Sequence, residues 1–136
     1  MCGKRGVLAA LAAGIVITVI SLVVGMIVQS IWPYDIFTLG GMRAKDDPIM
    51  ILFFLHPFVL AGAMTIVYAK LSGALSGDIT QKGKKFGLLM WAVVSLPSIF
   101  LVYSSMNYPL GFHLSGLIGS LIYMPAAGIT IAKLMK

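Results

Sequence analysis

Two histidines, His56 and His113, are the side chains with the richest chemistry inside the apolar part of the sequence. A neutral imidazole donates one hydrogen bond and accepts another, binds metals and exchanges a proton near neutral pH. Ionisable groups within a membrane are candidate functional groups because placing them there is costly. Two imidazoles from two helices can also ligate one haem iron. The pair therefore suggests a ligand or cofactor site, with haem, a quinone or a lipid headgroup as its candidate ligand.

Three further polar residues are predicted to lie on the same side of the membrane and to complete a shallow pocket: Gln29, Tyr103 and Asn107. The two histidines differ in depth, however. His56 lies 14 residues before Lys70, whereas His113 lies 20 residues before Lys133. This mismatch of six positions corresponds to ~9 Å of helix rise. A common site for both imidazoles therefore requires helix tilt or proline kinks to bring the two levels together.

No set of residues in the sequence indicates catalysis. A hydrolase needs a nucleophile, a base and an orienting group within reach of one another, and nothing places a base beside a serine. Two histidines without a nearby carboxylate or thiolate pattern do not make a metal motif, so no metal is predicted. Cys2 is the single cysteine and cannot form an intramolecular disulfide. The sequence favours a protein that is not an enzyme.

Long apolar segments must position these residues. The chain is 60% hydrophobic and 10% charged, whereas soluble proteins average roughly 45–50% and about 25%. Residues 6–34, 48–69 and 86–132 contain no Asp, Glu, Lys or Arg, and a polar run ending at Pro109 divides the third stretch. We predict an all-α fold, a four-helix transmembrane bundle forming one integral membrane domain over residues 1–136. The expected helices cover about residues 6–32, 48–71, 86–103 and 110–135.

The ends of two of these helices carry local signals. Asp47 followed by Pro48 is a good helix start, because the aspartate can accept from orphan amides and proline lacks an N–H that would go unused. The run 78–81 has the pattern of a capping box, which would start the third helix early, with an exposed first turn.

Lys and Arg residues give the predicted orientation. Eight of the ten lie on one side of the predicted membrane: Lys4, Arg5, Lys70, Lys82, Lys84, Lys85, Lys133 and Lys136. Because cationic loops resist translocation, both termini are expected in the cytoplasm, with the protein in the cell (inner) membrane. The net charge of +6 is then a topology signal and does not indicate nucleic-acid binding. Lys82, Lys84 and Lys85 are expected to contact anionic lipid headgroups.

Small residues recur on one face of the fourth predicted helix, at Gly111, Ser115 and Gly119. A spacing of four places them in line, and small side chains let a second helix approach closely. The pattern predicts a packing surface, either for another helix of the same chain or for a neighbouring subunit.

Sparse polar chemistry and small-residue faces together favour a protein that acts by association. We expect a homo-oligomer or an accessory subunit of a larger membrane complex. One alternative is a haem-, quinone- or lipid-binding membrane protein that uses His56 and His113. A second alternative is a small transporter or channel with an uncharged pathway, lined by Ser95, Ser98, Ser115, Ser120 and Thr130.

Overall fold

The computed structural model describes residues 3–136, so Cys2 lies outside the described residues. The chain is all-α and folds into four long helical rods. The elements are α1 (Lys4–Ile31), η1 (Ile36–Thr38) in the loop that follows, α2 (Met50–Leu71) continued by η2 (Ser72–Ala74), a third rod made of α3 (Ile79–Met90), η3 (Trp91–Ser95) and α4 (Leu96–Ser105), and α5 (Leu110–Leu134). Each rod is long and apolar enough to cross a bilayer, so the protein is a small multi-pass membrane protein.

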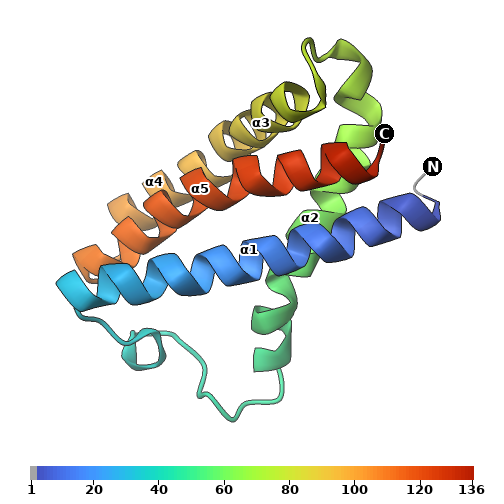
Figure 1. Ribbon diagram of the computed structural model, residues 1–136. Helices are drawn as coiled ribbons and strands as arrows, with labels where there is room; N and C mark the ends of the chain where they lie inside the picture. The colour runs from blue at the N-terminus through green and yellow to red at the C-terminus, as the bar shows by residue number, and fades with distance from the viewer. Residues whose placement is uncertain (1–2) are drawn as a thin grey trace.

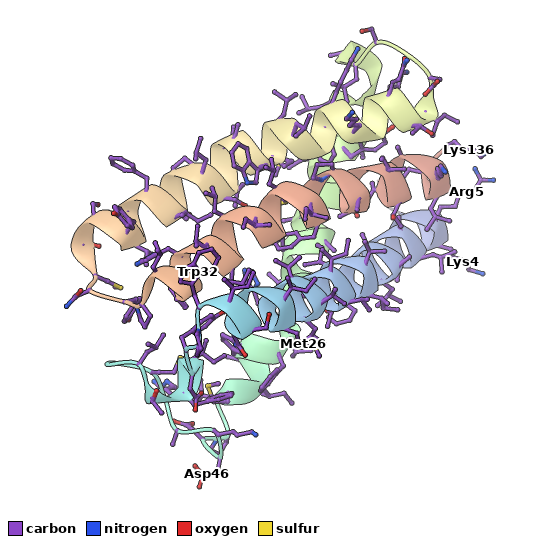
Figure 2. The ribbon with its side chains drawn as sticks, turned by 60° about the vertical axis from the view of Figure 1, so that its left-hand side comes forward. Lys4, Arg5, Met26, Trp32, Asp46 and Lys136 are labelled. Atoms are coloured by element: carbon purple, nitrogen blue, oxygen red, sulfur yellow. The ribbon has the colours of Figure 1, made fainter. Side chains whose placement is uncertain are left out.

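Three rods run roughly alongside one another, and α2 crosses behind them (Figure 1). Both termini lie at one end, where the Arg5 guanidinium Nη1 donates a hydrogen bond of 2.7 Å to the carbonyl oxygen of Lys136. Figure 2 shows Lys4, Arg5 and Lys136 together at this end, with Trp32 and Asp46 away from it. We call the end with both termini the basic end, and the end that carries the connection between α1 and α2 the loop end.

The third rod begins seven residues before the predicted residue 86, as the capping-box pattern indicated. The Asp78 carboxylate accepts from the Gln81 backbone N–H at 2.8 Å, and the Gln81 side chain accepts from the Asp78 N–H at 3.2 Å. The prediction that this helix starts at residue 86 was wrong because it was based on where the apolar stretch begins, whereas the first turns of α3 are polar. The polar first turns are held instead by this reciprocal cap and by packing against α5.

The start of α2 also differs from its prediction, by two residues. Backbone bonds from Met50 to Asp47 and from Leu52 to Ile49 form tight turns before the regular helix begins at Met50. The Asp47 carboxylate accepts the Ile49 N–H at 2.9 Å, so it satisfies an orphan amide as expected.

Glycines let α3 and α5 touch through their backbones. A Cβ added to Gly83 would lie 2.5 Å from the Ile129 Cα, and one added to Gly87 would collide with the backbone of Met124 and Pro125. Gly128 meets Gly83 and Gly87 from the opposite helix. The spacing from Gly83 to Gly87 is the Gly-x-x-x-Gly arrangement that brings membrane helices into close contact.

The apolar core lies toward the basic end. It contains Ala13 and Ile17 from α1, Met64 and Tyr68 from α2, Phe86 from α3, and Met124, Ala127 and Ile131 from α5. The Tyr68 and Phe86 rings pack edge to face with centroids 5.2 Å apart. The bundle is thus closely packed in its basic half, where all four rods meet.

A wide π turn at η3 accommodates Pro97 in the third rod. Proline has no backbone N–H and crowds the preceding turn, and an i→i+5 turn relieves that crowding. The Trp91 indole Nε1 donates to the Ser120 Oγ at 3.0 Å, and Ser120 in turn donates to the Gly116 carbonyl at 2.6 Å. These bonds fix the third rod against α5 immediately before α4 reaches the loop half.

Candidate functional site

Both histidines line one cavity in the loop half of the bundle. We call it the histidine cavity; its volume is about 440 Å³, and all four rods contribute to its wall. Its wall consists of Ser21, Gly25, Tyr34, Ile36, Phe53, His56, Ser98, Ile99, Val102, Phe112, His113, Ser115, Gly116, Gly119 and Tyr123. The two histidines line this cavity despite the six-position mismatch counted along the sequence, because α2 crosses the other rods and does not run parallel to α5 (Figure 1).

His113 is held by aromatic rings. The residue is 8% exposed, and its ring packs edge to face on Tyr103 at 5.1 Å and on Phe112 at 5.6 Å between centroids. Tyr108 lies 6.4 Å away. Within residues 3–136 no hydrogen bond reaches the imidazole, and neither of its nitrogens is fully buried. His113 therefore has a fixed ring and free hydrogen-bonding groups.

His56 stands on the part of α2 that has left the bundle. From Ile51 to Leu55, five consecutive apolar residues are 44–63% exposed. Because successive helical residues are ~100° apart, five in a row cover every face, so every face of this segment is at least partly exposed. His56 follows directly, is itself exposed, and makes no hydrogen bond within the described chain. An unpartnered imidazole at membrane depth is costly unless something binds it.

A second, larger hollow adjoins the histidine cavity. We call it the α1–α2 groove; it has a volume of about 880 Å³ and lies between α1, the exposed part of α2 and the loop around η1. The two hollows share the same six wall residues: Ser21, Gly25, Tyr34, Ile36, Phe53 and His56. Most of the remaining groove wall is apolar, including Leu22, Met26 and Phe54. Together the two hollows form a mainly apolar space, with the two histidines and several hydroxyl groups on the wall of the histidine cavity.

The polar groups on the wall of the histidine cavity are hydroxyls and imidazoles. The Tyr34 hydroxyl donates to the Ser115 Oγ at 2.8 Å, which leaves the Ser115 hydroxyl hydrogen free to donate. The Ser98 hydroxyl donates to the Val94 carbonyl at 2.7 Å. No Lys, Arg, Asp or Glu is among the wall residues of either hollow in the described chain. The site can donate hydrogen bonds to a neutral acceptor, but its described wall offers no lysine or arginine to a phosphate or carboxylate.

The other predicted ligand residues are placed differently. Gln29 lines the α1–α2 groove but not the histidine cavity. Tyr103 lines neither hollow and instead supports the His113 ring. Asn107 lies exposed in the turn between α4 and α5, on the wall of neither hollow. Of the five candidates, the structure brings His56 and His113 together and places Gln29 nearby.

The small residues of α5 face α1. A Cβ on Gly111 would lie 2.5 Å from the Trp32 carbonyl oxygen, whereas one on Gly119 would lie 3.7 Å from Val24, an ordinary contact. Ser115 receives the Tyr34 hydrogen bond from the chain that follows α1. In this structure the face packs within the chain.

The residues expected to line an uncharged pathway do not form one lining. Ser98 and Ser115 lie on the wall of the histidine cavity. Ser120 is engaged by Trp91, and the Thr130 hydroxyl donates to the Ala126 carbonyl at 2.9 Å. Neither residue, nor Ser95, lines the histidine cavity or the groove.

Two features of the site were not found from the sequence. Tyr34 was not among the predicted site residues, and its hydroxyl donates a hydrogen bond to Ser115 on α5. The Gly83–Gly87 spacing was readable in the sequence, yet Gly83 fell outside the helix predicted over residues 86–103, whereas Gly87 fell inside it. Recognising the cap at Asp78 as the true helix start would have placed both glycines on a helix.

Among residues 3–136 no group of three or more His, Cys, Asp or Glu side chains is arranged to hold a metal ion. No protein-family model matches this chain, and neither a curated protein nor a solved structure was found that matches it. The geometry of the two hollows is therefore the basis for assigning a function.

Proposed function

We propose that this membrane protein binds an uncharged amphiphile, with a carbonyl-bearing head in the histidine cavity and an apolar tail in the α1–α2 groove. The observation that carries the proposal is the placement of His56 and His113 on one cavity wall without hydrogen-bond partners in the described chain. An isoprenoid quinone has this chemistry. Its carbonyl oxygens accept hydrogen bonds, and its tail is as apolar as the groove.

The uncharged wall supports this choice of ligand class. An anionic headgroup would bring a buried charge into a site whose described wall carries no lysine or arginine, which is unfavourable. The propionates of haem would meet the same difficulty. A neutral carbonyl instead accepts from an imidazole N–H or from the free Ser115 hydroxyl. Each such bond contributes on the order of 1 kcal/mol, and the tail adds about 0.8 kcal/mol for each CH₂ group buried from water.

Binding of a decyl-substituted benzoquinone to the purified protein in detergent tests the proposal. We expect the probe to raise the Tm progressively with concentration, as a ligand of the folded state does. His56→Leu with His113→Phe should abolish the rise, while Val93→Leu, on an exposed residue that lines neither hollow, should retain it. Dodecyl phosphate should have no comparable effect. An equal rise in the double variant would contradict the proposal.

Association is a second candidate function, favoured by the exposed 51–55 segment of α2. In a bilayer such a segment gains packing and van der Waals contact when another protein covers it. A homo-oligomer, or a larger complex with this chain as an accessory subunit, would provide that cover. Because lysine and arginine are concentrated at the basic end, we also propose that this end faces the cytoplasm, with the protein in the cell (inner) membrane.

A further inference from the structure

A third hollow, of about 650 Å³, opens at the basic end, between the start of α3 and the end of α5. We call it the lysine cleft. Its wall includes the side chains of Lys82, Lys133 and Lys136, together with Thr80 and Asp78. It lies at the opposite end from the histidine cavity and contains no residue of that site.

The three lysines of the cleft are free to bind an anion. Within residues 3–136, none of their ammonium groups makes a hydrogen bond or an ion pair. The ion pair in this part of the chain joins Arg43 and Asp47. Asp78 is the acid on the wall, and its carboxylate is occupied by the Gln81 backbone N–H. The cleft therefore presents three cations beside one acid that caps a helix.

The spacing of Lys82 and Lys133 is fixed by the helix contact described above. Lys82 precedes Gly83, whose missing side chain allows α3 to rest on the backbone of Gly128 and Ile129. Lys133 lies one helical turn after Ile129 on α5. The bond from Arg5 to the Lys136 carbonyl ties the main chain at the end of α5 to α1 (Figure 2). The backbone positions of Lys82 and Lys133 are thus set by the contact between α3 and α5, and the main chain of Lys136 is tied to α1.

We infer that the lysine cleft binds the phosphate of an anionic lipid headgroup in the leaflet at the basic end. Lysine ammonium groups bind phosphate as point charges, and the Thr80 hydroxyl can add a hydrogen bond. The cleft lies where α5 ends, which is the level at which a headgroup meets a membrane-spanning helix. Lys85, expected from the sequence to take part, is already engaged because its Nζ donates to the Ser76 carbonyl and to the Ser76 hydroxyl oxygen, both at 2.9 Å. Lys84 does not line the cleft.

Lipid retention on the full chain in detergent, measured by native mass spectrometry, tests the inference. The probe is phosphatidylglycerol, with phosphatidylcholine as the reference. We expect Lys82→Gln with Lys133→Gln to weaken phosphatidylglycerol binding about thirtyfold, from about fivefold for each lysine near a membrane surface. The matched control, Lys4→Gln with Lys84→Gln, removes the same charge outside the cleft and should change binding less than threefold.

Two outcomes would overturn the inference. Equal loss in both double variants would show a diffuse charge effect, and unchanged binding in the Lys82/Lys133 variant would show that lipid does not use the cleft. Inorganic phosphate at millimolar concentration distinguishes a free anion from a lipid. We expect it to leave bound phosphatidylglycerol in place, and complete displacement would assign the cleft to a soluble phosphate. Unchanged Tm values for both variants without added lipid would establish that folding is intact.

Discussion

The Tyr34 hydroxyl donates a 2.8 Å hydrogen bond to the Ser115 Oγ, across 81 positions of sequence. The bond joins the loop after α1 to α5, and both residues line the histidine cavity. It therefore couples the position of the loop to the shape of the site.

Removing either partner of this hydrogen bond should lower the free energy of unfolding by about the same amount. Tyr34→Phe and Ser115→Ala should each destabilise the protein by about 1 kcal/mol, the usual contribution of one such hydrogen bond. The double variant should cost little more than either single variant, because both remove the same interaction. Unfolding measurements in detergent on the three variants check this. Fully additive losses would show that the two hydroxyls act independently.

Backbone contact between α3 and α5 should make Gly87 intolerant of a methyl group. Gly87→Ala places a Cβ against the backbone of Met124 and Pro125, which cannot rotate away, and should destabilise the fold by about 1–3 kcal/mol. Gly62→Ala is the matched control, because nothing lies within 4 Å of its added Cβ. Alanine there should be neutral or stabilising by up to about 1 kcal/mol. Similar Tm values for the two variants would contradict the packing described for α3 and α5.

Acid should loosen the loop end through Asp47. The Ile49 backbone N–H and the Arg43 guanidinium, each 2.9 Å from a carboxylate oxygen, hold the pKa of Asp47 below its ordinary value of 3.8. A carboxyl with a lowered pKa in the folded state stabilises fully above its unfolded pKa, and this contribution disappears as the pH falls through the folded pKa.

Hydrogen exchange of residues 43–50 should therefore accelerate between about pH 5 and about pH 2, beyond the intrinsic effect of pH on exchange. Asp47→Asn should remove this extra acceleration, and Asp46→Asn, whose parent carboxylate makes no hydrogen bond in the described chain, should retain it. An identical pH response in the wild type and in Asp47→Asn would contradict the assigned role of Asp47.

The exposed 51–55 segment of α2 makes the association hypothesis testable. If a second copy covers it, a cysteine at Ile51 (Ile51→Cys), which lines neither hollow, should form a cross-linked dimer in membranes, while Val93→Cys, also exposed but on η3, should not. Non-reducing gels of the two variants, each made with Cys2→Ser, check this. Equal or absent cross-linking at both positions would count against a specific interface on α2.

The four membrane rods could be predicted from the sequence because about 20 apolar residues suffice to span a bilayer, and that signal is local. The early start of α3 was partly readable from Asp78 and Gln81, but the polar composition of 79–85 outweighed it. The presence of His56 and His113 on the wall of one cavity could not be predicted. It depends on the crossing of α2 with the other rods, and that angle is set by long-range packing such as the contact of Tyr68 with Phe86. Counting residues along each helix assumes parallel helices, and α2 crosses the others (Figure 1).

Identification of what the protein retains from its own membrane tests the central claim most directly. The wild type and the His56→Leu/His113→Phe variant are purified in parallel, extracted with organic solvent and compared by mass spectrometry. The binding site described above predicts about one uncharged, carbonyl-bearing amphiphile per wild-type chain and its loss from the variant. An equal amount of the same molecule in both samples, or only bulk phospholipid in the wild type, would contradict it.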